Sequence, residues 1–192
     1  MKKKIILASN SPRRKELLKS AGVEFEVIVS DINEDVHICD DPKRMVLDLA
    51  KAKAEAVKSK INSDAVIIGA DTVVYLDEIF GKPSSKNEAM MMLERLSGRK
   101  HSVYTGICIC DTYENKYIGK AVETIVEFRE ITKDEIIEYV DTGEPYDKAG
   151  AYAIQGGAAK FVRSVCGDYN NVVGLPLAEV LEAFDILGIQ GR

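Results

Sequence analysis

The segment SNSPRR, at residues 9–14, places hydroxyls, a proline and adjacent arginines between an apolar run and a helical pattern. The proline is expected at the first position of a helix, where unpaired backbone N–H groups and the positive dipole end attract anions. Arg13 and Arg14 add guanidiniums that bind phosphate oxygens in pairs. Because Ser11 has no Glu or Gln three residues later, we expect the hydroxyls of Ser9 and Ser11 to stay free for a ligand. A phosphate site and an exposed basic turn paired with surface acids explain these residues equally well.

Two acidic positions are candidates for catalysis or metal binding. Asp71 follows the apolar run at 65–69 and is expected at a strand end rather than inside a sheet, a position that catalytic carboxylates favour. A turn aspartate that bonds its own backbone is the commoner explanation of an isolated Gly-Ala-Asp-Thr. Glu34, in an acidic loop, can join Asp71 in holding a hard divalent ion through oxygen ligands, or can simply be solvated.

Three lysines and one glutamine can add further polar contacts to an anionic ligand. Lys53, Lys82 in FGKP and Lys148 in GEPYDKAG each offer a point charge to a phosphate chain, and each alone also fits a surface lysine. Gln155, in the small-residue segment GAYAIQGG, carries an amide that can donate to and accept from a nucleobase edge. A tight glycine turn between strands is the alternative for this segment.

Bulk composition limits the classes of function. The chain has 192 residues, 46% of them hydrophobic, which suffices for one buried core or two small lobes. The formal net charge of -5 disfavours nucleic-acid polymers, so a phosphate ligand needs a local basic cluster. The four cysteines lack metal-type spacing and are expected to be reduced. The basic and apolar start is too short for a signal sequence, and no stretch predicts a membrane span, so we expect a cytoplasmic protein.

The order of elements predicts a single mixed α/β domain over residues 1–192, with long strands bending around a groove. Neither a repeat nor a Pro/Gly-rich linker divides the chain. Strands are expected at 4–8, 24–29, 65–69, 72–75, 79–80, 101–110 and 117–128. Helices are expected at 12–21, 42–58, 87–96, 132–140 and 177–187, the fourth starting with a capping box at Thr132 and Glu135.

Seven blocks in order, SNSPRRKELL, LAKAKA, GADTVV, FGKP, LSGRKHSVYTG, GEPYDKAGAYAIQG and GDYNNVVGLPL, closely resemble the Maf family of nucleoside triphosphate pyrophosphatases. The resemblance covers nearly the whole chain. It implies a mixed, elongated sheet with flanking helices in two lobes around a cleft, similar to the inosine triphosphate pyrophosphatases, in a homodimer. The implied reaction hydrolyses a nucleoside triphosphate between the α and β phosphates with one divalent metal, Mg²⁺ or Mn²⁺.

The resemblance also implies roles for individual residues. Asp71 matches the family's catalytic aspartate, the usual proton acceptor, and Glu34 matches the acidic-loop glutamate at the metal. Thr72 and Gln155 match the branch that acts on dTTP and UTP, and with Arg13 they are the expected base-selectivity residues. The residues implied in phosphate binding are Ser9, Ser11, Arg13, Arg14, Lys53 and Lys82.

Some alternatives stay open at this point. Asn33 stands where the family usually has a second aspartate, which predicts at most a weaker metal affinity. Asp71 either takes a proton from water or orients a metal-bound hydroxide. The expected cellular role is removal of unwanted or modified pyrimidine nucleotides. The alternatives are a nucleotide-binding regulator of septum formation and a pyrophosphatase for non-standard purine nucleotides such as ITP.

Overall fold

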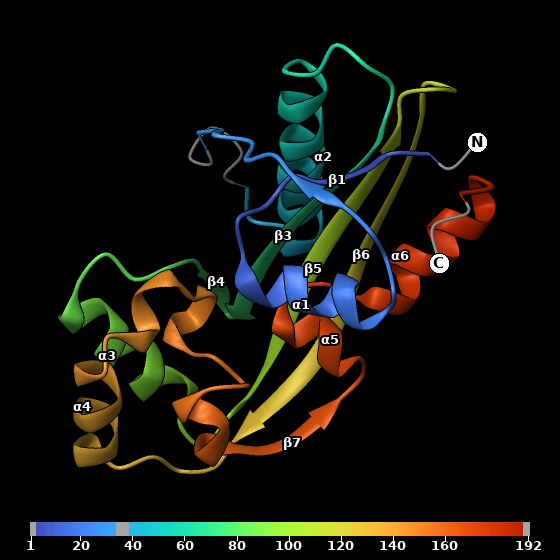
Figure 1. Ribbon diagram of the computed structural model, residues 1–192. Helices are drawn as coiled ribbons and strands as arrows, with labels where there is room; N and C mark the ends of the chain where they lie inside the picture. The colour runs from blue at the N-terminus through green and yellow to red at the C-terminus, as the bar shows by residue number, and fades with distance from the viewer. Residues whose placement is uncertain (1–2, 34–38, 190–192) are drawn as a thin grey trace. The chain divides into compact units, whose positions relative to one another are not determined.

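The computed structural model describes residues 3–33 and 39–189 (Figure 1). The chain divides into two compact units that interleave along the sequence. The first unit holds the chain up to Asp71, residues 105–122 and the chain from Gly174 onward, and the second holds residues 72–104 and 123–173. These units match the two expected lobes, whereas the cleft stays a prediction.

The strands form a mixed sheet in the order β2-β1-β3-β5-β6-β7, with β4 paired to β3. β1 lies parallel to both β2 and β3, whereas β4 and β7 are antiparallel to their neighbours. The predicted fold class, a mixed sheet with flanking helices, is therefore confirmed. The strands are β1 (Ile5–Leu7), β2 (Glu26–Val27), β3 (Val66–Leu76), β4 (Glu78–Phe80), β5 (Lys100–Asp111), β6 (Lys116–Phe128) and β7 (Val162–Cys166).

In the first unit, helices cover both faces of the sheet. Successive β1 residues point to opposite faces: Ile5 and Leu7 pack in one core cluster, and Ile6 and Ala8 pack in another. The first cluster receives side chains from α1 (Pro12–Ser20) and α6 (Leu177–Ile186), and the second from α2 (Pro42–Lys58). The first unit is thus a three-layer α/β sandwich, which accounts for strands that are apolar on both faces.

Two strand glycines let α2 lie unusually close to the sheet. A Cβ on Gly69 of β3 would fall 2.0 Å from the carbonyl oxygen of Ala50, and a Cβ on Gly106 of β5 would fall 2.3 Å from that of Val46. Real Cβ atoms essentially never approach a heavy atom below 3.0 Å. Any larger residue at Gly69 or Gly106 would therefore push α2 outward.

In the second unit, helices α3 (Lys86–Leu96) and α4 (Lys133–Asp141) pack side by side (Figure 1). Short 3-10 turns follow α4 at η2 (Glu144–Asp147), η3 (Ala149–Ala151) and η4 (Gly157–Phe161), and α5 (Tyr169–Val173) follows β7. Buried aromatic rings of this unit pack edge to face. The ring centroids of Phe128 and Tyr152 lie 4.8 Å apart, and those of Tyr139 and Phe161 lie 5.4 Å apart.

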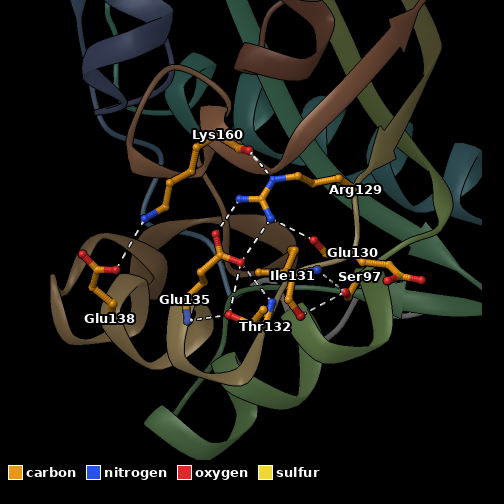
Figure 2. Close-up of polar contacts among 8 residues, drawn as sticks. All are labelled: Ser97, Arg129, Glu130, Ile131, Thr132, Glu135, Glu138 and Lys160. Atoms are coloured by element: carbon orange, nitrogen blue, oxygen red, sulfur yellow. Dashed lines mark hydrogen bonds and ion pairs between the residues drawn. The ribbon is translucent and has the colours of Figure 1, made fainter.

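A polar network fixes the start of α4 (Figure 2). The capping box predicted from Thr132 and Glu135 is confirmed, because each accepts a hydrogen bond from the other's backbone N–H. The Arg129 guanidinium donates to both carboxylate oxygens of Glu135, at 2.6 and 3.1 Å, and to the carbonyl oxygen of Lys160. The hydrogen bonds from Arg129 lower the pKa of Glu135 to about 2.

The expected elements differ from the observed ones in several places, and α5 and the 3-10 turns η2, η3 and η4 have no predicted counterpart. The runs at 65–69 and 72–75 join into one strand, β3, because Ala70 and Asp71 between them are part of the same strand. The run at 24–29 keeps only Glu26–Val27 as strand, both residues exposed at the sheet edge. β7 was not predicted, since its residues are mostly exposed and lack an apolar pattern. Among the helices that the structure describes, none has the length and apolar character needed to cross a bilayer.

Candidate functional site

A nearly buried ion pair joins α2 to β3 in the first unit. Lys53 Nζ of α2 donates to Asp71 Oδ1 of β3 at 2.6 Å, and each side chain is only 10% exposed. The packing of α2 on Gly69 explains the contact, since Lys53 lies about one helical turn after Ala50 and Asp71 lies two residues after Gly69 on the same face of β3. Buried charges are retained only where such a partner offsets their desolvation.

The expectation that Asp71 lies at a strand end is wrong. Asp71 is inside β3, which continues to Leu76. The neighbouring strand β1 ends sooner, however, with Leu7 paired to Ile68 and the Ala8 N–H bonded to the Ile68 carbonyl. Asp71 therefore lies just beyond the carboxyl end of β1, the side of a parallel sheet where ligands bind in open α/β proteins.

The hydroxyls at the start of α1 are hydrogen-bonded within the protein, so the expectation that they stay free is also wrong. Ser11 is the N-cap, and its Oγ accepts from the N–H of Arg14 at 3.5 Å. Ser9 Oγ accepts from the N–H of Ser11 at 3.3 Å and from Arg14 Nη1 at 3.2 Å. The turn out of β1 brings both hydroxyls onto these donors. An accepting hydroxyl still carries a proton that it can donate.

The two arginines play different structural parts. Arg14 Nε donates to the Gly174 carbonyl at 2.7 Å, and Nη1 donates to the Ala70 carbonyl at 2.9 Å. Because Ala70 directly precedes Asp71, this contact joins the start of α1 to the strand that carries the carboxylate. Arg13 is half-buried and forms no hydrogen bond or ion pair with any residue in the ranges 3–33 and 39–189. The first turn of α1 holds no acidic residue that would offset these charges.

The other predicted site residues lie elsewhere. Thr72 is half-buried on β3, and Lys82 and Gln155 are exposed, all three in the second unit. Lys148, also in that unit, is buried and bonded to the Glu144 carbonyl and the Asp147 carboxylate, so its charge is engaged within the protein. Glu34 lies outside the described residues.

Sequence reasoning missed the acceptors that hold Arg14. They are backbone carbonyls of Ala70 and Gly174, which carry no side-chain signal, and Gly174 lies 160 positions away in the sequence. Within the described parts of the chain, no group of three His, Cys, Asp or Glu side chains is placed to hold a metal ion. The cysteines agree with the expected reduced state: Cys108 and Cys110 are free and buried, and burial raises the pKa of Cys108 to about 12.

This combination of fold and polar residues has close counterparts in sequence. The pattern of the family described as Maf-like protein matches residues 4–186, so the chain belongs to that family. The dTTP/UTP pyrophosphatase of Thermoanaerobacter sp. (strain X514) is 50% identical over 188 residues, covering 96% of this chain and 95% of the relative. That of Alkaliphilus metalliredigens (strain QYMF) is 50% identical over 179 residues, covering 93% of each chain. That of Bacillus cereus (strain G9842) is 48% identical over 188 residues, covering 96% and 97%.

Solved structures show a more distant likeness. A HAM1 protein from Coxiella burnetii matches with a TM-score of 0.48 and 16% identity, covering 97% of this chain and all of the other. The Ham1 protein of Staphylococcus aureus matches with a TM-score of 0.44 and 15% identity, covering 98% of this chain and all of the other.

Proposed function

We propose that this protein hydrolyses dTTP and UTP to the nucleoside monophosphate and pyrophosphate. The relatives described above, at about half identity over almost the entire chain, carry the name dTTP/UTP pyrophosphatase and support a nucleoside triphosphate pyrophosphatase. The structural observation that carries the proposal is the Arg14 bond to Ala70, because it brings a cationic helix start next to the Lys53–Asp71 pair.

The cationic groups are proposed to bind the triphosphate. Arg13, whose guanidinium has no partner within the described residues, is the group best able to take two phosphate oxygens. Arg14 supports the turn, and the Arg13 N–H with the hydroxyls of Ser9 and Ser11 offers shorter-range donors. Lys53, and Lys82 from the second unit, are the remaining proposed phosphate ligands. Preorganised cations stabilise the charge that grows on the leaving pyrophosphate.

Asp71 is the proposed catalytic residue. In the proposed step, a water oxygen attacks the α-phosphorus while the bond from that phosphorus to the oxygen bridging to the β-phosphate breaks. The water proton passes to the Asp71 carboxylate, and pyrophosphate leaves with the bonding electrons. The short contact with Lys53 fixes the carboxylate's orientation, which matters because misplacement by about 1 Å can cost about a hundredfold in rate.

A divalent cation, Mg²⁺ or Mn²⁺, is part of the proposal. Magnesium is commonly held by one or two carboxylates together with substrate phosphates and water, and the Asp71 carboxylate fits that donor set. Glu34, the second proposed ligand, lies outside the described residues. When bound, such an ion would neutralise phosphate charge. Activity should vanish after chelation and return with added magnesium.

Base selectivity is proposed to come from Arg13, Thr72 and Gln155. Gln155 is exposed and carries an amide that can complement a pyrimidine edge. Gln155→Glu removes the amide donor and adds negative charge, so its kcat/KM for dTTP and UTP should fall relative to other nucleoside triphosphates. An unchanged substrate profile would remove Gln155 from this role.

The primary test is incubation with magnesium and each common and non-standard nucleoside triphosphate, with pyrophosphate and phosphate measured separately. The proposal expects pyrophosphate, with dTTP and UTP preferred; phosphate release, or a preference for ITP, would refute it. Asp71→Asn should abolish turnover while the thermal unfolding curve stays cooperative. The matched control is Asp77→Asn, an exposed hairpin acid with a φ of 61°, which asparagine tolerates.

The homodimer and the cytoplasmic location also stay proposals. Light scattering at several concentrations tests the first, and cell fractionation tests the second. Neither a nucleic-acid polymer nor a membrane is a proposed partner.

A further inference from the structure

The turn that carries Gln155 is held at both ends by two side chains that no role yet explains. The Gly156 N–H donates to the Ala153 carbonyl at 3.0 Å and closes the turn. Within it, Ile154 points inward and is 7% exposed, while Gln155 is exposed. An outward side chain between two fixed ends has its direction set by the backbone on either side.

The first end is fixed by Tyr139 of α4. The N–H of Ala153 donates to the Tyr139 hydroxyl at 3.1 Å, and that hydroxyl donates to Glu144 Oε1 at 2.9 Å. The Tyr139 ring is 1% exposed and packs edge to face on Phe161. Burial, above all, raises the pKa of the Tyr139 hydroxyl, which keeps it protonated as a donor.

The second end is fixed by Glu144. The N–H of Gly157 donates to both carboxylate oxygens of Glu144, each at 3.1 Å. A Cβ on Gly156 would fall 2.1 Å from Glu144 Oε1, so the carboxylate occupies the space that any other residue at 156 would need. This close approach explains a glycine at Gly156, where the sequence alone offered only a tight glycine turn.

Glu144 is itself held in place. Its N–H donates to Thr142 Oγ1 at 3.2 Å, and Thr142 Oγ1 donates to the Tyr139 carbonyl at 2.6 Å. The carboxylate thus connects the end of α4 to the far side of the Gln155 turn.

We propose that Glu144 and Tyr139 are positioning residues for substrate selection: together they hold both ends of the 153–157 turn, so that the Gln155 amide meets the pyrimidine base in one orientation. The proposal rests on the proposed function, because it takes Gln155 to contact the base. Loss of the contacts that Glu144 and Tyr139 make with this turn should reduce discrimination between bases more than it reduces the rate of hydrolysis.

The experiment compares Glu144→Gln with Glu138→Gln, an exposed glutamate of α4 whose carboxylate lies 3.8 Å from Lys160 Nζ (Figure 2). The ratio of kcat/KM for dTTP to that for GTP should fall about tenfold or more in Glu144→Gln, because the amide lacks the charge and one of the two acceptor oxygens, and should stay unchanged in Glu138→Gln. In a Gln155→Ala background, Glu144→Gln should change the ratio no further, because both changes then act through one side chain.

Amide hydrogen exchange gives a readout that does not depend on activity. Protection of the Gly157 N–H should fall in Glu144→Gln and persist in Glu138→Gln. Unchanged protection, or an additive effect on the kcat/KM ratio in the Gln155→Ala background, would overturn the proposal. Should Glu144→Gln fail to fold, Tyr139→Phe, which removes only a hydroxyl, decides by the same measurements. Absence of dTTP hydrolysis by the wild-type protein would refute the proposed function. Amide hydrogen exchange would still test whether Glu144 and Tyr139 hold the 153–157 turn.

Discussion

Replacement of Gly69 by alanine tests whether the close packing of α2 on the sheet positions the catalytic pair. A Cβ at this position would lie 2.0 Å from the Ala50 carbonyl oxygen, so α2 must withdraw by about 1 Å to reach the 3.0 Å limit. The same withdrawal takes the 2.6 Å contact between Lys53 and Asp71 to about 3.6 Å, too long for a hydrogen bond.

Two quantities should change in Gly69→Ala. Overpacking of this kind costs about 1–3 kcal/mol, which for a chain of this size lowers the midpoint of thermal unfolding by about 2–12 °C. Loss of the Lys53 contact that orients the Asp71 carboxylate should lower kcat/KM for dTTP by about a hundredfold. Differential scanning calorimetry and pyrophosphate release measure the two effects.

Gly119→Ala is the matched control. Gly119 also lies on a strand of the first unit, but its nearest neighbour to an added Cβ is Leu47 Cδ2 at 3.6 Å, an ordinary contact. This variant should keep both the wild-type unfolding midpoint and activity. If Gly69→Ala keeps the unfolding midpoint and activity of Gly119→Ala, α2 does not depend on the glycine for its position.

Two further predictions concern pH in the second unit. Burial lowers the pKa of His101 to about 4, so its contribution to stability is complete above pH 6.5. The free energy of unfolding should then fall by up to about 1.4 kcal/mol per pH unit as pH drops from 6.5 toward 4. His101→Phe should lack this slope in urea titrations, and an equal slope would contradict the assignment. The pKa of Glu135, lowered to about 2 by Arg129, gives stability that is present above pH 4.5 and lost as pH falls through 2. Arg129→Met should therefore lose less stability than the wild type as pH falls from 4.5 to 2, which acid unfolding followed by circular dichroism measures. An equal loss in the two proteins would contradict this assignment.

Much of the fold was predictable because local signals carried it. α2 begins and ends as its apolar periodicity indicated, and Val46, Leu49 and Ala50 on its apolar face are buried. The α4 capping box followed from Thr132 and Glu135 alone. Local interactions of this kind depend on neighbours three or four residues away, and the sequence displays those neighbours directly.

The candidate site was predictable in composition but not in geometry. The pattern pointed to Arg13, Arg14, Lys53 and Asp71 as polar groups for one ligand, and it misjudged where Asp71 lies in its strand. It also gave both arginines the same phosphate-binding role. Backbone carbonyls far along the chain distinguish them, and hydrogen bonds to backbone atoms leave no trace in residue type.

The amino-acid sequence by itself determined the family, the order of helices and strands, and the residue types available for binding an anion, because these follow from motifs and from periodicity. Only the tertiary structure decided that Lys53 meets Asp71, that Arg14 serves the turn, and that Glu144 holds the turn that carries Gln155. Contacts of this second kind depend on how closely elements pack: a Cβ at Gly69 would displace the helix that carries Lys53, and a Cβ at Gly156 would displace the Glu144 carboxylate.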